Sequence, residues 1–244
     1  MDSLFRFRRF SVRNRDSALK VGTDAVLLGV AMTLAESDHK LLDIGTGTGV
    51  IAPMAAQRLS EINPGPFSID AIDIDRPSAK EAGYNFASSP WAESLRAECC
   101  PLSAFMPEDK YDLIFSNPPF YDNSLVNPDP RETVARHTGS LSYRDICAFA
   151  ANNLCPEGRL ALILPSDSEL ALKRIAASFG LRLFRILRIR PTAAKPVRRI
   201  IAEFSLSSSP ACPADEEIAL QQGSARTPEY AALTKDFYLQ GTGS

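Results

Sequence analysis

The sequence predicts an α/β fold with a doubly wound, mostly parallel sheet, and three observations predict it. Short apolar runs typical of buried strands alternate with runs of helical period, which is the order found in parallel sheets covered by helices. A glycine-rich loop, Gly45-Thr46-Gly47-Thr48-Gly49, follows the first of these strands. An acidic residue, Asp73, ends the next strand, roughly 20 residues beyond the loop, as in nucleotide-binding βαβ units.

Seven strands are expected in this sheet, with an antiparallel strand at its C-terminal end. They are predicted over residues 40–44, 67–72, 95–99, 111–116, 160–164, 181–190 and 197–206. Amphipathic or apolar runs predict helices over residues 25–35, 50–59, 79–87, 141–154 and 168–179. Thr23 or Asp24 is expected to cap the N-terminus of the first of these helices, and Asp75 is expected to cap the third. Gly180 is expected to end the last helix as its C-cap. Alternating Phe and Arg residues predict a further strand over 5–12.

A single domain is expected from the 244 residues, of which 45% are hydrophobic. Residues 1–35 would form an N-terminal extension, 36–206 the catalytic core, and 207–244 a linker and C-terminal tail. The longest apolar run, 25–35, is shorter than the roughly 20 residues of a membrane span. Five cysteines without a Cys-x-x-Cys pair, and two histidines far apart, lack a metal-site pattern. We therefore expect reduced thiols, a cytoplasmic location, no bound metal and no membrane contact. We also expect a monomer.

Charge is distributed unevenly along the chain. The net charge of −2 argues against a general nucleic-acid binder. Residues 1–20, however, hold six basic side chains against two acids, and residues 182–199 hold seven against none. The two stretches predict one basic face for phosphate contacts, with Arg188 and Arg190 as candidates. The alternative is that both are ordinary solvated surfaces.

The motif expected to carry the chemistry is Ser116-Asn117-Pro118-Pro119-Phe120, directly after the apolar run 111–115. Proline cannot continue a central strand and fixes the backbone beyond it. The motif offers the amide oxygen of Asn117, the carbonyl of Pro118 and the ring of Phe120. Two acceptors and an aromatic face suit a planar group with an exocyclic amine. The motif could also be only a turn that ends a strand.

A polar segment rich in Pro, Asn and Asp follows over residues 121–140. It has no periodicity, which favours a loop over the site. Arg131, Arg136 and His137 lie on it, and the two arginines are candidates for gripping a substrate.

These motifs together resemble the class I S-adenosylmethionine-dependent methyltransferases that methylate amines. Three further segments, Lys20-Val21-Gly22-Thr23-Asp24, Arg131-Glu132-x-x-Ala135-Arg136 and the closing 234–239, resemble the tRNA1(Val) adenine-N6-methyltransferase family. The resemblance implies S-adenosylmethionine as cofactor and tRNA as partner, with methylation of the adenine immediately 3′ of the anticodon.

Site roles follow from the resemblance residue by residue. Asp43 and the glycines Gly45, Gly47 and Gly49 would hold the methionine end of the cofactor, and Asp73 its ribose. Residues 117–120 would hold the target base, and the turn containing Lys20, Thr23 and Asp24 would close the cofactor pocket. Related enzymes usually place an Asp after the third strand to bind the cofactor adenine, whereas this chain has Glu98-Cys99-Cys100-Pro101-Leu102 there.

Other functions compete with this one. The same chemistry could act on guanine N2 of ribosomal RNA or on a protein glutamine. A dinucleotide-dependent oxidoreductase shares the pattern of strand, glycine loop and acid, but it gives no reason for Asn-Pro-Pro-Phe. An RNA-binding module with an inactive cofactor site is the remaining alternative.

Overall fold

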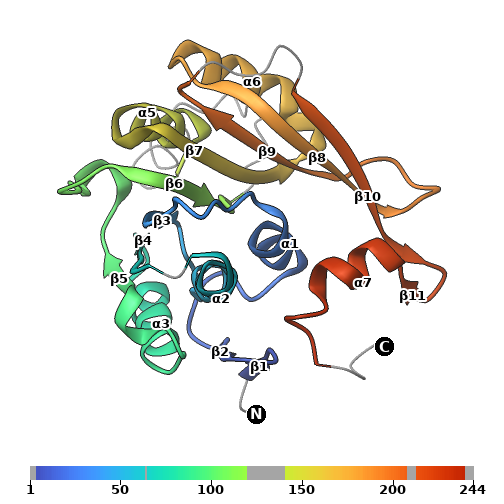
Figure 1. Ribbon diagram of the computed structural model, residues 1–244, viewed down its shortest axis with the longest axis horizontal. Coiled ribbons are helices and arrows are strands. Elements are labelled where there is room, and N and C mark those ends of the chain that lie inside the picture. The colour runs from blue at the N-terminus through green and yellow to red at the C-terminus, as the bar shows by residue number, and fades with distance from the viewer. Residues whose placement is uncertain (1–3, 64, 120–140, 208–212, 240–244) are drawn as a thin grey trace, which may run out of the picture.

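The computed structural model describes residues 4–63, 65–119, 141–207 and 213–239 (Figure 1). Within these residues the main sheet has nine strands in the order β11-β10-β8-β9-β7-β6-β3-β4-β5. Their bounds are β3 Lys40–Ile44, β4 Ser68–Asp73, β5 Leu95–Cys99, β6 Tyr111–Ser116, β7 Leu154–Pro165, β8 Arg182–Thr192, β9 Arg199–Ser205, β10 Ala214–Gln222 and β11 Ala225–Arg226. Strands β3 to β7 pair in parallel, and β9 is antiparallel to both β7 and β8. The predicted doubly wound α/β fold is confirmed.

The sheet continues beyond the seven predicted strands, because β10 pairs in parallel with β8 and β11 pairs with β10. The described part of the chain after residue 207 thus contains strands that the sequence analysis did not expect. Acidic residues open β10, and such residues disfavour an isolated strand. They are stabilised here by arginines of β8, a long-range contact that local sequence does not reveal.

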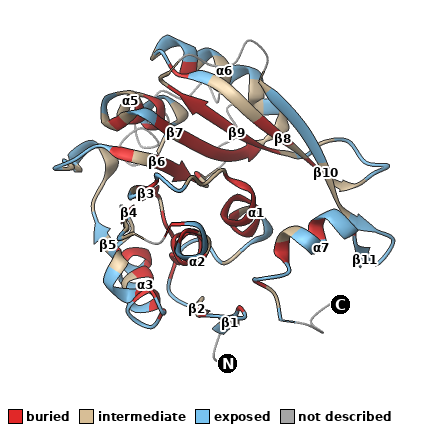
Figure 2. Ribbon diagram, in the orientation of Figure 1, coloured by how far each residue is buried: buried red, intermediate tan, exposed pale blue. Residues whose placement is uncertain are grey.

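Helices cover both faces of the sheet (Figure 1). One face carries α1 Thr23–Ala31, α2 Ile51–Ile62 and α3 Arg76–Ala87, and the other carries α5 Tyr143–Asn153 and α6 Glu169–Ser178. Alternate residues of β3 serve the two cores, with Leu41 packed in one and Leu42 in the other. Figure 2 shows the buried central strands between helices whose outer surfaces are exposed. In the described residues, no helix combines the length and apolarity that a membrane span requires.

The N-terminal segment forms a hairpin in place of the single strand expected over 5–12. Strands β1 Leu4–Arg6 and β2 Ser11–Arg13 pair antiparallel, and the turn between them closes with a bond from the Phe7 N–H to the Phe10 carbonyl. The Arg8 N–H donates to the Phe237 carbonyl at 2.8 Å, so the C-terminal segment after α7 Pro228–Thr234 lies against the hairpin. The two ends of the described chain therefore stabilise each other.

The helix caps agree with the sequence in part. Asp75 caps α3 as predicted, since its carboxylate accepts from the Ser78 N–H at 3.0 Å. Gly180, at φ +78°, follows the end of α6 as expected. The N-cap of α1 is Gly22, however, and neither Thr23 nor Asp24 caps it. Both lie in the first turn instead, where the carboxylate of Asp24 interacts favourably with the positive end of the helix dipole.

Candidate active site

Three loops meet at the carboxyl ends of β3, β4 and β6. Parallel pairing places Ile44 beside Ile72 and Asp43 beside Phe115, so the segments that follow these strands leave the sheet at one rim. The Ser116 hydroxyl donates to the Ile44 carbonyl at 2.6 Å and ties the end of β6 to the glycine loop. The predicted meeting of the glycine loop, Asp73 and the Asn-Pro-Pro segment is therefore observed, since Gly45, Gly47, Asp73 and Pro119 line one cleft.

The glycine loop needs glycine for two reasons. Gly45, Gly47 and Gly49 have φ values of +71°, +57° and +75°, which side chains disfavour. At Gly49 a Cβ atom would also lie 2.7 Å from the Phe86 ring, so α3 packs directly against the loop. The backbone of the loop therefore favours glycine at all three positions, most strictly at Gly49.

Asp73 holds the loop and faces the cleft. Its Oδ2 accepts from the Gly47 N–H and its Oδ1 from the Asp75 N–H, both at 2.8 Å. Burial raises the pKa of Asp73, while these two bonds oppose the shift. Each carboxylate oxygen keeps a further lone pair, so the group can still accept from hydroxyls such as a ribose diol.

Asp43 is fully buried beneath the loop. Its Oδ2 accepts from the Thr46 hydroxyl at 2.7 Å, and its Oδ1 has no hydrogen-bond partner among the described residues. Burial raises the pKa of Asp43 to about 7. The hydrogen bond from Thr46 lowers the pKa, and the negative charge of Asp73 makes a smaller contribution that raises it. A buried, half-satisfied carboxyl of this kind is stabilised by a proton or by a cationic ligand.

Asn117 presents a second unsatisfied acceptor. Its Oδ1 is shielded from solvent and has no hydrogen-bond partner in the described part of the chain. Such atoms are costly in a folded protein, and in a cleft they indicate a ligand donor. Pro118 is buried behind it and Pro119 lines the cleft, whereas Phe120 lies outside the described residues.

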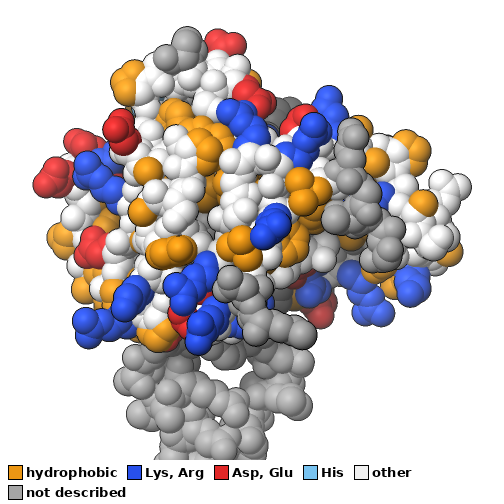
Figure 3. Space-filling model, turned by 90° about the horizontal axis from the view of Figure 1, so that it is seen from below, with side chains coloured by type: hydrophobic (Ala, Val, Ile, Leu, Met, Phe, Trp, Pro, Cys, Tyr) orange, Lys and Arg blue, Asp and Glu red, His pale blue; other side chains and the backbone are white. Residues whose placement is uncertain are grey.

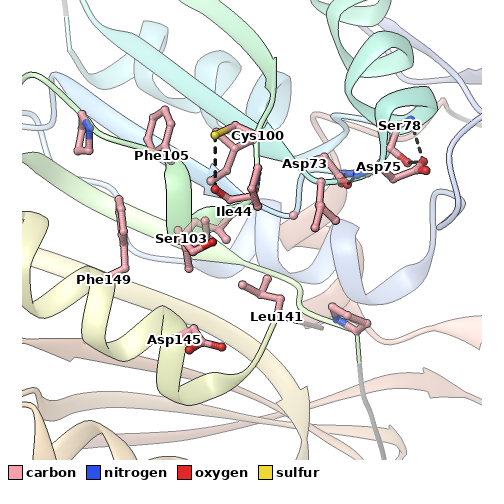
Figure 4. A pocket seen from close by; sticks show the side chains of 18 of the residues that line it. Ile44, Asp73, Asp75, Ser78, Cys100, Ser103, Phe105, Leu141, Asp145 and Phe149 are labelled. Atoms are coloured by element: carbon pink, nitrogen blue, oxygen red, sulfur yellow. Dashed lines mark hydrogen bonds between the residues drawn. The ribbon is translucent and has the colours of Figure 1, made fainter. Parts of the chain in front are cut away.

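The cleft at this rim has a volume of about 890 Å³ and two chemically different ends. The end near α3 presents Asp73, Asp75 and Ser78, and the far end presents the rings of Phe105 and Phe149 (Figure 4). In place of an acid after β5, the wall here contains Cys100, Pro101, Leu102 and Ser103. An elongated ligand with a polar, hydroxylated part and a flat apolar part fits this arrangement.

An N-terminal turn covers the glycine loop. Ala18 and Leu19 line the cleft, and a Cβ on Gly47 would lie 3.6 Å from the Ser17 hydroxyl. The turn is held by Glu81 of α3, whose carboxylate accepts the backbone N–H groups of residues 15, 16 and 17 at 2.7 to 2.9 Å. Sequence reasoning missed Glu81, because its partners are backbone groups more than 60 residues away.

Of the predicted cofactor residues, Gly45, Gly47 and Asp73 line the cleft, whereas Asp43, Gly49 and Asn117 lie within two residues of lining residues along the chain. Lys20, Thr23 and Asp24 also lie outside the lining. The Lys20 ammonium donates to the carbonyls of Arg15 and Ser17, and Asp24 pairs with Arg199 at 2.8 Å. Thr23 is exposed at the start of α1. Lys20 thus stabilises the turn over the loop, and a direct contact of these three residues with the cofactor stays a prediction.

The predicted RNA contacts fall into two groups. Arg131 and Arg136, like His137, lie outside the described residues. Arg188 pairs with Glu169 and Asp215, both at 2.8 Å, and Arg190 pairs with Glu217 at 2.6 Å. These carboxylates neutralise Arg188 and Arg190, which weakens the prediction that these two arginines contact RNA.

Helix α5 contributes a wall that the sequence analysis did not assign to the site. The cleft is lined there by Leu141, Asp145, Ala148, Phe149 and Asn152. Leu141 lies just before the helix, and Asp145, Ala148, Phe149 and Asn152 share one face of it, so the signal was present in the sequence. No group of three or more His, Cys, Asp or Glu side chains suited to a metal occurs in the described residues.

Comparisons with known proteins agree with this geometry. The family model for the methyltransferase small domain matches residues 16–180. A relative from Parabacteroides distasonis is 40% identical and one from Flavobacterium johnsoniae 37% identical, and each match covers 97% of this chain and at least 98% of the relative. Both are named tRNA1(Val) (adenine(37)-N6)-methyltransferase. This chain belongs to that methyltransferase family.

A solved structure supports the fold of the methyltransferase. A predicted O-methyltransferase from Agrobacterium tumefaciens has a TM-score of 0.67 and 17% identity, covering 88% of this chain and 96% of its own. The resemblance noted in the sequence is confirmed, and the cofactor of this methyltransferase is S-adenosylmethionine. The cleft suits it, because Asp73, Asp75 and Ser78 lie at one end and the rings of Phe105 and Phe149 at the other.

Proposed function

We propose that this methyltransferase transfers a methyl group to N6 of an adenine in tRNA, at adenine 37 next to the anticodon of tRNA1(Val). The observation that carries the proposal is the shielded Oδ1 of Asn117, an acceptor without a partner among the described residues at the rim of the cofactor cleft. An adenine amino group can donate the hydrogen bond that this oxygen lacks. The names of the relatives supply the identity of the RNA.

The chain's own task in this reaction is to position the amine. The lone pair of an adenine N6 is delocalised into the ring, so the nitrogen is a poor nucleophile while its hydrogens lie in the ring plane. Asn117 Oδ1 and the Pro118 carbonyl each accept one N–H and hold the nitrogen so that its lone pair faces the methyl donor. Phe120 stacks on the base after it leaves the RNA stack. S-adenosylmethionine, when bound, supplies a methyl group already activated by its sulfonium.

Cofactor binding is assigned to the groups around the glycine loop. Asp73 accepts the ribose hydroxyls, and Asp43 balances the charge of the amino group at the methionine end. Gly45, Gly47 and Gly49 let the backbone approach the ligand closely. Lys20, Thr23 and Asp24 belong to the segment that closes the pocket. Arg131 and Arg136 contact the RNA, and the protein acts as a monomer in the cytoplasm, where tRNA is found.

The decisive experiment incubates the purified protein with labelled S-adenosylmethionine and an unmodified tRNA1(Val) transcript. We expect N6-methyladenosine after nuclease digestion and mass spectrometry. A transcript with guanosine at position 37 is the matched control and should remain unlabelled. Labelling of guanine N2 in ribosomal RNA, or of a protein glutamine, with none in the tRNA would replace the proposal by one of the competing amine substrates.

A further inference from the structure

A second, basic groove lies beside the cofactor cleft. It is lined by Arg13 at the end of β2, by Arg15 and Asp16 of the N-terminal turn, and by Arg76, Pro77, Lys80, Glu81 and Tyr84 of α3, and we call it the α3 groove. Figure 3 views the molecule from the side on which β1, β2 and α3 lie in Figure 1, and Lys and Arg side chains gather on part of that face. We propose that the α3 groove binds the sugar-phosphate backbone of the RNA substrate, an inference that rests on the proposed function.

The charge of the α3 groove is available to a ligand. Arg76 and Lys80 are exposed and form no ion pair with any described residue. Of the two acids, Glu81 is buried and its oxygens accept three backbone N–H groups. Asp16 makes long pairs with Arg13 at 3.4 Å and Arg15 at 3.7 Å. Four cations against two engaged carboxylates leave a positive surface, which favours phosphates.

An aromatic ring accompanies these cations. Tyr84 is 56% exposed, and the Arg13 guanidinium lies 5.2 Å from the centre of its ring. Arg76, Lys80 and Tyr84 are four residues apart, so they form one stripe along α3 with a spacing of about 6 Å. A stripe of cations that ends at an exposed ring is typical of surfaces that follow a nucleic-acid strand, where bases stack on the ring and phosphates meet the cations.

The position of the α3 groove relates it to catalysis. Asp75 and Ser78 line the cofactor cleft, while Arg76 and Pro77 of the same helical turn line the groove. Similarly, Ala18 and Leu19 line the cleft and Arg15 and Asp16 the groove. The same two segments therefore separate the two sites. An RNA strand whose target base enters the cleft can place neighbouring phosphates in the groove, which fixes register without reading sequence.

The test compares two double variants with the same change in charge. R76Q/K80Q removes the two unpaired cations of the α3 groove. K110Q/R182Q removes two exposed cations that form no ion pair with a described residue and lie just before β6 and at the start of β8, at the amino ends of these strands and so away from the carboxyl-end rim. Binding of the unmodified tRNA1(Val) transcript is measured by fluorescence anisotropy between about 50 and 200 mM salt. Cofactor affinity and melting temperature serve as folding controls.

We expect R76Q/K80Q to weaken RNA binding about tenfold at low salt and to reduce the slope of log K against log salt by about 1.4, while cofactor affinity is unchanged. K110Q/R182Q should leave both RNA affinity and slope unchanged. Tyr84→Ala should weaken binding about fivefold with the slope retained, and Tyr84→Phe should restore it. Equal RNA affinity and equal slope in the two double variants would overturn the proposal that the α3 groove binds RNA, but not the proposed function. Failure of the wild-type protein to bind or methylate the transcript would overturn the proposed function as well.

Discussion

The cleft rim and the β8–β10 edge of the sheet differ in whether their polar side chains have partners. At the edge, Arg188 and Arg190 are paired with carboxylates of β10, and Arg188 also with Glu169. At the rim, Asp43 and Asn117 each retain a shielded oxygen without a partner among the described residues. Because an unsatisfied shielded acceptor costs stability, its presence at the rim indicates a binding requirement. The paired edge has a structural role.

The edge also contains a buried network. Arg185 pairs with Glu203 at 2.6 Å and with Glu216 at 3.0 Å, and Glu203 is fully buried. Removal of one partner of such a pair strands a buried charge and costs about 3–5 kcal/mol. Variants at the edge should therefore alter stability, and variants at the rim should alter chemistry or ligand affinity.

Asn117→Ala is expected to have the largest effect. Loss of the amide oxygen removes one of the two acceptors that orient the amine, so we expect the single-turnover rate to fall about 1,000-fold. Cofactor affinity, measured by calorimetry, should change little. Arg188→Gln at the edge is the control and should keep a rate close to that of the wild type. A rate within tenfold of the wild type for Asn117→Ala would remove Asn117 from the mechanism.

Asp73→Ala should act on cofactor binding. The carboxylate offers charged acceptors to the ribose and also fixes the Gly47 N–H, so we expect the dissociation constant for S-adenosylmethionine to rise about 10- to 100-fold. Asp73→Asn separates the two contributions, because an amide oxygen can still accept the Gly47 bond while the charge is lost. Unchanged affinity in both variants would contradict the ribose assignment.

Asp43 should make cofactor binding depend on pH. Burial raises the pKa of this carboxyl to about 7, so it is protonated in acid and cannot then balance a cationic amino group. We expect cofactor affinity to fall about tenfold between pH 8 and pH 6. The affinity of Asp43→Asn should be lower and should vary less with pH. An identical pH profile in this variant would assign the dependence to another group.

The same raised pKa predicts a stability effect with a defined sign. The folded state binds the Asp43 proton more tightly than the unfolded state, so folding stability contributed by this group is present below pH 3.8 and is lost as pH rises toward 7. The full loss is about 4 kcal/mol. Asp43→Asn should therefore raise the melting temperature of the protein without cofactor at pH 8, and a lower melting temperature would contradict the charge argument.

Local patterns in the sequence were sufficient for the rim. Glycines at alternate positions, Asp73 at a strand end and Asn-Pro-Pro after β6 can be placed from strand period and parallel topology alone. Glu81 could not be found this way, because the N–H groups that it accepts belong to a distant turn. The β10 strand was missed for a related reason. Its first residues pair with β8, whose arginines lie about 30 residues earlier in the chain and form ion pairs with these acidic side chains.

The smallest effect on RNA binding is expected for R188Q/R190Q, the counterpart of R76Q/K80Q at the edge. Both arginines have carboxylate partners, and the hydrogen bonds that Arg188 donates to Glu169 and Asp215 raise its pKa above the ordinary value. We expect the free energy of unfolding to fall by about 1–2 kcal/mol, since these pairs are partly exposed. RNA affinity should change less than about twofold. If the affinity instead falls as far as in R76Q/K80Q, then phosphates displace the β10 carboxylates, and Arg188 and Arg190 contact RNA after all.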